Sequence, residues 1–341
     1  MAIKSALAKV LERQDLDADE MQQVMRQIMK GEATDAQIGG FLVALRAKGE
    51  TVTEITAAAR VMRELATPVI VNADHLVDIV GTGGDVCHTF NVSTASAFVV
   101  AAAGGTVAKH GNRAVSSSSG SADLLEAAGV NLQLSAEQVA ASIAQIGLGF
   151  MFAPLHHSAM KHAIGPRKEM GVRTIFNVLG PLTNPAGVTN MLLGVFDSQL
   201  LEPMAEVLRE LGGERVMVVR ADDSLDEFSI SAPTQCVELR DGELRRMTFS
   251  PEDFGLQRQP LANIQVESVA ESLAMIQGVL ANEPSAARDT VLMNAGAAIY
   301  MADLTDDMAS GVQLAREVIT DGRARRKLDA FVALTQSLAV Q

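Results

Sequence analysis

The stretch Asp78-Ile79-Val80-Gly81-Thr82-Gly83-Gly84-Asp85 joins a short apolar run to a glycine-rich loop that ends in a carboxylate. Glycines let the backbone turn tightly and bring N–H groups close to anionic oxygens, and the carboxylate suits a sugar hydroxyl or a cation. The stretch therefore favours a loop that binds a phosphorylated ligand. An ordinary strand-to-helix turn is the alternative, because short glycine clusters are common in α/β proteins.

After Pro68, short β-rich runs alternate with helical segments. The β-rich runs comprise residues 77–80, 106–108, 191–195 and 215–220. This alternation predicts an α/β fold with a largely parallel central sheet covered on both faces. Ligands of such sheets bind at the carboxyl ends of the strands, so chemically important residues should follow the strands.

The first 66 residues have a different pattern, in which apolar side chains recur at three- and four-residue spacing. This periodicity predicts a bundle of about four helices. The candidate N-caps are Thr34 and either Thr51 or Thr53. The acidic cluster at residues 15–19 is assigned to helix capping rather than to a calcium loop, because Glu20 stands where that loop needs glycine.

Composition excludes several classes of protein. The 341 residues are 48% hydrophobic and carry a formal net charge of -13, which disfavours binding to nucleic acid. Two distant cysteines, Cys87 and Cys236, indicate neither a zinc site nor a disulfide framework. The N-terminal stretch is charged and amphipathic, and no apolar run approaches the roughly 20 residues that span a bilayer. We therefore expect a cytoplasmic protein that does not enter a membrane.

Two further segments suit an anion. Asn91-Val92-Ser93-Thr94 opens an apolar helical run, and free N–H groups at a helix start attract phosphate. The stretch 109–121 combines Lys109 and Arg113 with serines that lead into a helix predicted at 122–128. It favours a phosphate site over a flexible linker. Neither a dinucleotide-binding fingerprint nor a Walker loop is present, because Val86 stands at the place of the third glycine and no Gly-Lys-Ser/Thr follows.

The stretch Asp222-Asp223-Ser224-Leu225-Asp226-Glu227 follows a predicted strand. It is either a solvated acidic loop or a magnesium site, since Mg²⁺ prefers carboxylate and phosphate oxygens. Three histidines, at 156, 157 and 162, lack the usual zinc spacing and suggest a basic pocket wall instead. Arg167 follows them and is suited to a planar carboxylate.

Taken together, these motifs resemble the anthranilate phosphoribosyltransferase family of tryptophan biosynthesis. The resemblance rests on Gly-Thr-Gly-Gly-Asp, Asn-Val-Ser-Thr, Lys-His-Gly-Asn-Arg-Ala-Val-Ser-Ser, the segment 171–185 and Leu-Asp-Glu, in the family's order over about residues 5–335. It implies a two-domain fold like that of nucleoside phosphorylases. Residues 1–70 and a returning segment at about 166–187 would form a small helical domain, and residues 71–165 and 188–341 a larger α/β domain. A homodimer through the helical domain is also implied.

The resemblance also assigns residues to ligands. Phosphoribosyl pyrophosphate would contact Gly81, Gly84, Asp85, Thr89, Asn91, Val92, Ser93, Thr94, Lys109, His110, Gly111, Asn112, Arg113, Ala114, Val115, Ser116, Ser117 and Ser121. Anthranilate would contact Gly81, His110, Asn112, His157 and Arg167. Mg²⁺ would be held by Ser93, Asp226 and Glu227, and the catalytic residues would be Lys109, Asn112 and Arg167.

The implied reaction transfers the 5-phosphoribosyl group from phosphoribosyl pyrophosphate to the amine of anthranilate. A nucleoside phosphorylase-like enzyme and a non-catalytic relative that binds nucleic acid are the alternatives. The Leu225-Asp226-Glu227 motif favours a pyrophosphate donor over the first, and the acidic charge disfavours the second. The chain departs from the family pattern at Val86, Ser158 and Ser224, where Gly, Pro and Gly are usual; these changes concern loop flexibility rather than chemistry.

Overall fold

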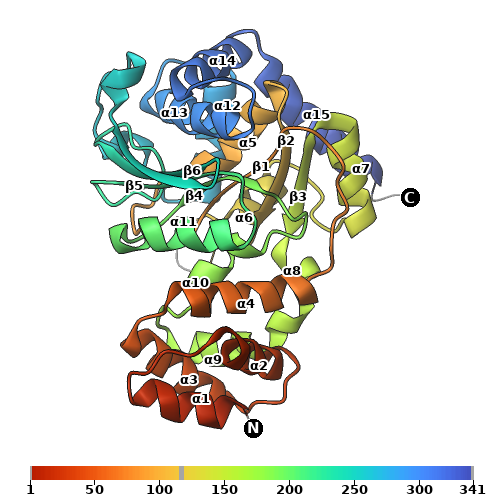
Figure 1. Cartoon of the computed structure of the whole chain (residues 1–341). Helices are drawn as coiled ribbons and strands as arrows, with labels where there is room; N and C mark the ends of the chain where they lie inside the picture. Colours follow the sequence, from red (N-terminus) through yellow and green to blue (C-terminus); the bar gives the residue numbers. More distant parts are fainter. Residues whose placement is uncertain (1, 115–118, 339–341) are drawn as a thin grey trace.

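The chain folds into a small helical part and a larger α/β part (Figure 1). The computed structural model describes residues 2–114 and 119–338. In Figure 1 the helical part lies at the bottom and contains the N-terminus, and the α/β part lies above it. This arrangement confirms the fold class predicted from the sequence.

Four helices form most of the small part. They are α1 (Ala2–Leu11), α2 (Ala18–Met29), α3 (Asp35–Lys48) and α4 (Val52–Leu65). The apolar side chains of α2 at 21, 24, 25 and 28 are buried, as expected for one face of an amphipathic helix. Helices α2, α3 and α4 each begin with a capping box, at Asp17, Thr34 and Thr51. The predicted helix bundle and the predicted caps are confirmed.

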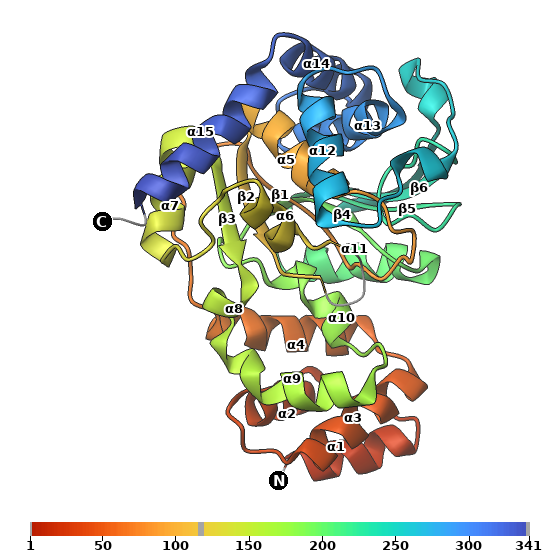
Figure 2. The same ribbon diagram turned by 180° about the vertical axis from the view of Figure 1, so that it is seen from behind.

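A later segment of the chain joins this bundle. Helix α9 (Lys161–Met170) packs against α3 and α2, and α10 (Phe176–Leu179) lies beside α4 (Figure 2). Ala163 and Phe176 belong to the same buried apolar cluster as Phe41 of α3. The contact starts before residue 166, because α9 already begins at Lys161. The division of the chain into two domains stays a prediction.

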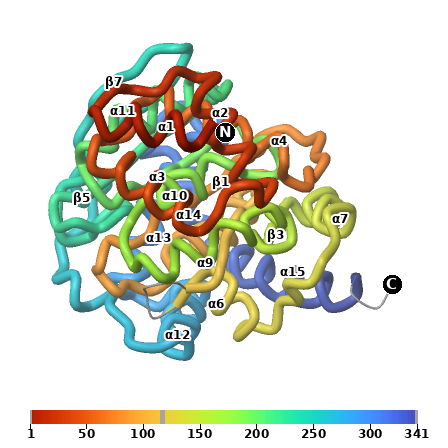
Figure 3. Tube along the Cα trace, turned by 90° about the horizontal axis from the view of Figure 1, so that it is seen from below, coloured from red at the N-terminus to blue at the C-terminus, as the bar shows by residue number. Residues whose placement is uncertain are grey.

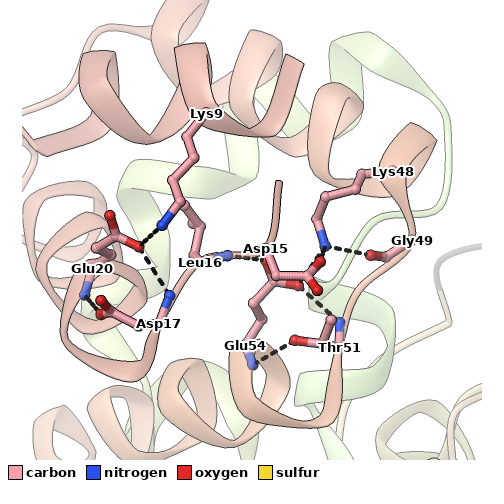
Figure 4. A network of polar contacts seen from close by, with 9 residues as sticks. All are labelled: Lys9, Asp15, Leu16, Asp17, Glu20, Lys48, Gly49, Thr51 and Glu54. Carbon is pink, nitrogen blue, oxygen red and sulfur yellow. Dashed lines mark hydrogen bonds and ion pairs between the residues drawn. The ribbon is translucent and has the colours of Figure 1, made fainter. Parts of the chain in front are cut away.

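A buried carboxylate fixes the turn between α1 and α2 (Figure 4). Glu54 of α4 is fully buried and accepts hydrogen bonds from the N–H groups of Leu16, at 2.9 Å, and Thr51, at 2.8 Å. The ammonium group of Lys48 lies 3.0 Å from Glu54 and 2.6 Å from the exposed Asp15. Glu54 therefore joins three segments of the bundle through one charged group.

We expect Glu54→Ala to lower the free energy of unfolding by about 3 kcal/mol, because the change breaks a buried ion pair and leaves two N–H groups without their acceptor. Urea unfolding followed by circular dichroism measures this. The control is Asp15→Asn, which removes the exposed partner of Lys48 and should cost less than about 1 kcal/mol. Equal losses in the two variants would contradict the role given to Glu54.

The larger part is built on a seven-stranded sheet in the order β3-β2-β1-β4-β5-β6-β7. The strands are β1 (Leu76–Gly81), β2 (Thr106–Gly111), β3 (Leu148–Phe152), β4 (Asn190–Gly194), β5 (Arg215–Ala221), β6 (Thr234–Arg240) and β7 (Glu243–Phe249). The first five in this spatial order pair in parallel, and β6 and β7 are antiparallel. The predicted largely parallel sheet is confirmed.

The sequence pattern identified four of these strands and missed β3, β6 and β7. All five residues of β3 are buried, and a continuous apolar run of that length does not distinguish a strand from a helix. A usable signal for the other two was present at Asp241-Gly242. Both residues have positive φ, 54° and 78°, as in the tight turn of a β-hairpin.

Helices cover both faces of the sheet. They include α5 (Val92–Ala102), α6 (Ser121–Ala127), α7 (Ala136–Ile146), α11 (Leu201–Glu210), α12 (Val269–Leu280), α13 (Ala286–Met301), α14 (Met308–Thr320) and α15 (Arg323–Leu338). The short helix α8 (Ala153–His156) directly follows β3. Short 3₁₀ segments are Ser158–Met160, Pro181–Thr183, Ser198–Leu200, Pro251–Phe254 and Leu261–Ile264. Helices α5, α12, α13 and α14 lie above the sheet and α11 below it in Figure 1, whereas α7 and α15 lie together beside β3 in Figure 3.

The sheet separates the two largest of the three apolar cores found in the described residues. The upper one contains most of α5 and α13, and the lower one joins α11 to the helical bundle through α4. In the upper core α13 and α14 approach closely, since a Cβ added at Gly311 would lie 2.3 Å from the carbonyl oxygen of Gly296. The Ala- and Gly-rich stretch at 294–298 thus serves packing between these two helices. None of the helices in the described part of the chain is long and apolar enough to span a membrane.

Candidate active site

The residues singled out from the sequence converge on one edge of the sheet. Strands β1, β2 and β5 end at Gly81, Gly111 and Ala221, and their parallel pairing through β4 places these ends at the same edge. In the sheet, β1 lies between β2 and β4. The chain runs from β1 outward to β2 and β3 on one side and then returns to the other side of β1 as β4. The glycine loop therefore lies where the strand order reverses, the usual place for a ligand in open α/β sheets.

The glycine loop after β1 contacts the acidic loop after β5. The N–H of Gly83 donates to Asp226 Oδ2 at 3.0 Å. A Cβ added at Gly81 would lie 2.5 Å from that oxygen, and one added at Gly194 would lie 1.5 Å from the carbonyl oxygen of Asp226. Only glycine leaves room for Asp226 at these two positions, so the glycine loop and the acidic loop form one structure.

The start of α5 brings in a second carboxylate and a cation. The N–H of Ser93 donates to Glu227 Oε1 at 3.1 Å. Lys109, a buried residue of β2, donates from Nζ to the Ser93 hydroxyl at 3.2 Å and to the carbonyl of Ile79 at 2.6 Å. The structure thus brings together the three residues predicted to bind magnesium and the lysine predicted to be catalytic.

Burial shifts the pKa values of these charged groups. It raises the pKa of Asp226 to about 7, and the nearby charge of Asp85 contributes in the same direction. Burial also raises the pKa of Glu227 well above its ordinary value, with further contributions from Asp226 and Asp85. The pKa of Lys109 is lowered by burial, although Asp78 and Glu227 oppose that shift. Two adjacent carboxylates with raised pKa values, and the negative charge of Asp85 nearby, favour a bound cation.

The donor atoms fit a hard divalent cation. Glu227 Oε2 is buried and has no hydrogen-bond partner among the described residues. Two carboxylates and a hydroxyl are oxygen ligands of the kind Mg²⁺ prefers, with phosphate oxygens and waters completing its shell. No cluster of three or more His, Cys, Asp or Glu side chains suited to a metal occurs in the described residues. Part of the shell would therefore come from a substrate.

Two histidines lie together beside this group. The rings of His110, at the end of β2, and His157, after α8, have centroids 5.0 Å apart. Burial lowers the pKa of His110 to about 3 and that of His157 to about 4. Both rings are therefore neutral at pH 7. His156 lies close to both rings, and its charge would further lower their pKa values, but its own Nδ1 bonds the carbonyl of Thr67. His162 lies elsewhere, against Gly31.

The low pKa of His157 makes the fold acid-sensitive. The unfolded chain takes up a proton near pH 6.5 and the folded chain only near pH 4, so stability falls as the pH drops through this interval. Between pH 7 and pH 5 this histidine should cost on the order of 2 kcal/mol. Urea unfolding at both pH values should show a smaller acid-induced loss for His157→Asn than for the wild type. An equal loss would contradict burial as the cause.

Arg167 presents an unpaired guanidinium group. Its Cζ lies 5.1 Å from the centroid of the Phe176 ring, and burial lowers its pKa. Within residues 2–114 and 119–338, the Arg167 guanidinium makes no hydrogen bond or ion pair, including none to Asn112 or His157. A partly buried guanidinium with free donors is suited to a planar carboxylate.

Asn112 and Arg113 directly follow β2 and precede the serine-rich stretch of the chain. Asn112 is exposed, and its Oδ1 accepts from the N–H of Arg113 at 2.8 Å. The guanidinium of Arg113 does not extend freely, because it pairs with Asp123 and Glu126 of α6. The predicted contacts of Val115, Ser116 and Ser117 lie outside the described residues.

Several other residues predicted to contact phosphoribosyl pyrophosphate contact other residues of the chain in this structure. The side chain of Asn91 bonds Ser119 and Ser272, at 2.7 and 2.8 Å. Thr89 pairs with Gln265 through an isolated β-bridge. Val92 is fully buried, and the Thr94 hydroxyl is buried without a partner among the described residues. The side chain of Asp85 accepts from the N–H of Cys87, and a Cβ added at Gly111 would lie 2.2 Å from the Ser121 hydroxyl oxygen. All of these ligand contacts stay predictions.

Two groups near the site were missed in the sequence. Asp78 is fully buried in β1 and accepts from Asn184 Nδ2 at 2.7 Å and from the N–H groups of Ile79 and His110. Burial raises its pKa to about 6, opposed chiefly by Lys109. The available signal was a carboxylate inside an apolar run, which is rare unless the charge is paired.

Arg173 is the second group near the site that the sequence analysis missed. Its guanidinium donates to the carbonyl of Gly84 and lies over the Phe196 ring, with Cζ 4.3 Å from the centroid. It thereby ties the segment after α9 to the glycine loop. The only signal for it was its place inside the motif at 171–185.

Two departures from the family pattern have a backbone explanation. Val86 and Ser224 have φ values of 58° and 82°, in the left-handed region. Glycine adopts this region without strain, whereas a β-branched residue such as Val86 does so rarely. The glycine usual in the family therefore matches the backbone at both positions. The side chain of Val86 avoids further conflict because 75% of it is exposed.

Comparison with known proteins gives a consistent assignment. The glycosyl transferase family helical bundle domain matches residues 4–66, and the glycosyl transferase family a/b domain matches residues 73–325. The anthranilate phosphoribosyltransferase of Thioalkalivibrio sulfidiphilus is 63% identical over 337 residues, which are 99% of this chain and 100% of that protein.

Solved structures agree with the sequence comparison. The crystal structure of anthranilate phosphoribosyltransferase from Thermus thermophilus superposes with a TM-score of 0.92 at 44% identity, covering 97% of this chain and 99% of that one. The Saccharomyces cerevisiae enzyme, in complex with phosphoribosyl pyrophosphate and Mg, gives a TM-score of 0.90 at 26% identity, covering 98% of each chain. The fold, the motifs and these matches together show that the chain belongs to the anthranilate phosphoribosyltransferase family.

Proposed function

We propose that the site transfers the 5-phosphoribosyl group of phosphoribosyl pyrophosphate to the amine of anthranilate, giving N-(5-phosphoribosyl)anthranilate and pyrophosphate for tryptophan biosynthesis. The observation that carries the proposal is the junction of the glycine loop with Asp226, Glu227, Ser93 and Lys109 at the reversal of strand order. The family assignment and the ligands of the yeast relative support it.

The donor end of the site holds charge. Ser93, Asp226 and Glu227 would hold Mg²⁺, which would neutralise negative charge on the pyrophosphate leaving group. The N–H groups of the glycine loop and of the α5 terminus would bind phosphate oxygens. Lys109 is anchored by Ile79 and Ser93, so its positive charge is fixed in place before the leaving group develops its own.

The acceptor end of the site holds the aromatic amine. Arg167 would bind the anthranilate carboxylate through parallel hydrogen bonds, and Asn112 would contact a polar group beside it. Neutral His110 and His157 would add hydrogen bonds without adding a second positive charge. The aromatic amine has its lone pair available at pH 7, so the residues mainly position it, and no strong base is required.

The proposal has a direct test. Anthranilate is fluorescent, and its fluorescence should fall when the protein, Mg²⁺ and phosphoribosyl pyrophosphate are mixed. Orotate, nicotinate and nucleosides with inorganic phosphate serve as alternative substrates and should not react. Absence of any change with anthranilate, under conditions where a characterised family member is active, would overturn the proposed function.

We also propose that the chain acts as a cytoplasmic homodimer that associates through its helical part. Three apolar side chains support this surface, because they are exposed on helices of the bundle: Leu11 on α1 by 66%, Val43 on α3 by 47% and Ile164 on α9 by 43%. Light scattering after size-exclusion chromatography should give twice the chain mass. Val43→Glu should shift that mass toward the monomer.

A further inference from the structure

The two ends of the loop that joins β2 to α6 are held together by one carboxylate. Asp123, in the first turn of α6, accepts at Oδ2 from the N–H of Ala114 at 2.8 Å and from the N–H of Gly120 at 3.1 Å. Beside it, the N–H of Ala122 donates to the carbonyl of Asn112 at 3.2 Å. We call residues 112–114 and 119–123 the neck of this loop.

The backbone at the neck and just before it is too tight for side chains at two glycines. A Cβ added at Gly120 would lie 2.3 Å from the nitrogen of Ala114 and 2.7 Å from the carbonyl oxygen of Asn112. A Cβ added at Gly111 would lie 2.2 Å from the Ser121 hydroxyl oxygen. The outgoing and returning backbones are therefore in direct contact, independently of the carboxylate that bridges them.

The guanidinium of Arg113 pairs with both Asp123 and Glu126, but backbone N–H groups donate only to Asp123 among the described residues. The Arg113 guanidinium lies 3.0 Å from Asp123 Oδ1 and 2.8 Å from Glu126 Oε2. Glu126 is exposed, and no backbone N–H of the described residues donates to it. Burial raises the pKa of Asp123, but hydrogen bonds from Ala114, Arg113 and Gly120 outweigh it and hold this pKa below its ordinary value. Asp123 is thus a charged acceptor at neutral pH.

We propose that Asp123 is a positioning residue for the phosphoribosyl donor, because it closes the neck and so fixes Asn112 and the N-terminus of α6 against each other. The inference rests on the proposed function and on the resemblance, which assigns Asn112 and Ser121, one on each side of the neck, to phosphoribosyl pyrophosphate, and Asn112 to anthranilate as well. Binding groups held in place before the ligand arrives lose less conformational entropy on binding. Opening the neck should therefore weaken donor binding, although Asp123 itself touches no substrate.

The test compares Asp123→Asn with Glu126→Gln. Both changes remove one negative partner of Arg113, but only the first also weakens the acceptor shared by Ala114 and Gly120, because a neutral amide oxygen accepts more weakly than a carboxylate. We expect Asp123→Asn to raise the KM for phosphoribosyl pyrophosphate roughly tenfold, the scale on which loss of an orienting partner affects a bound group, with kcat changed less than about threefold. Glu126→Gln should change either value less than about twofold.

Gly120→Ala is the second variant, since it keeps the carboxylate but forces the neck apart. It should also raise the donor KM, with circular dichroism and melting temperature showing that each variant is folded. Equal effects of Asp123→Asn and Glu126→Gln would overturn the proposal, because they would show that the loss of a negative partner for Arg113 causes the change in KM. A lower melting temperature with lower kcat and an unchanged donor KM would also overturn it, in favour of a structural role. Inactivity of the wild-type protein would instead contradict the proposed function.

Discussion

Replacing Glu227 by glutamine is expected to lower kcat/KM for phosphoribosyl pyrophosphate by a factor on the order of 100 or more, the range found when one electrostatic group of a catalytic site is lost. Glu227 has one carboxylate oxygen bonded to the Ser93 N–H and the other buried without a partner among the described residues. Glutamine keeps the shape of the side chain but removes the negative charge that would hold Mg²⁺. Higher Mg²⁺ concentrations should restore part of the lost activity.

The control for this prediction is Asp222→Asn in the same acidic loop. Asp222 is exposed, and among the described residues its side chain bonds only the side-chain amide of Gln235, at 3.3 Å. This variant should retain at least half of the wild-type kcat/KM and the wild-type dependence on Mg²⁺. If Asp222→Asn lost as much activity as Glu227→Gln, the effect would come from the charge of the loop rather than from a metal ligand.

Replacing Arg167 by alanine is expected to raise the KM for anthranilate roughly 50-fold, because a bidentate bond to a charged group is worth about 2 to 3 kcal/mol. The KM for phosphoribosyl pyrophosphate should change far less. Arg167 of α9 lies against the ring of Phe176 of α10, and its guanidinium has no hydrogen-bond or ion-pair partner within the described residues. Initial rates measured with each substrate varied in turn separate the two KM values.

Two companion variants refine this test. Arg167→Lys keeps the charge but not the planar pair of donors, so its anthranilate KM should lie between those of the wild type and the alanine variant. Lys168→Ala changes an exposed neighbour in the same helical turn and should leave both KM values within about twofold. Equal increases in the two substrate KM values for Arg167→Ala would contradict its role in holding the acceptor.

The parts of the fold that could be read from the sequence depend on neighbouring residues. The helix caps at Thr34 and Thr51 form bonds within three residues, and the amphipathic pattern of α2 repeats within one or two turns. The alternation of strands and helices likewise indicated the parallel sheet. Strand β3 was missed because its apolar run carries no periodicity, and β7 because many of its side chains are exposed.

The candidate site was only partly readable for a related reason. The glycine loop, Lys109 and the Asp226-Glu227 pair carry composition that suggests phosphate and magnesium. Asp78 and Arg173 had no such signal, because their roles come from distant partners: Asn184 lies 106 residues from Asp78, and Gly84 lies 89 residues from Arg173. A single sequence does not encode such pairings in any local pattern.

By itself, the sequence determined the N-terminal helix bundle and four strands, the family resemblance and the chemistry that each motif suits, since all of these depend on residue type and short spacing. Only the tertiary structure decided which groups meet. The bonds from Gly83 to Asp226 and from Ser93 to Glu227 join residues 143 and 134 positions apart, because parallel strands bring their carboxyl ends to one edge. Burial at that edge then raises the pKa values of both carboxylates and turns a glycine-rich turn into one wall of a proposed magnesium-pyrophosphate site.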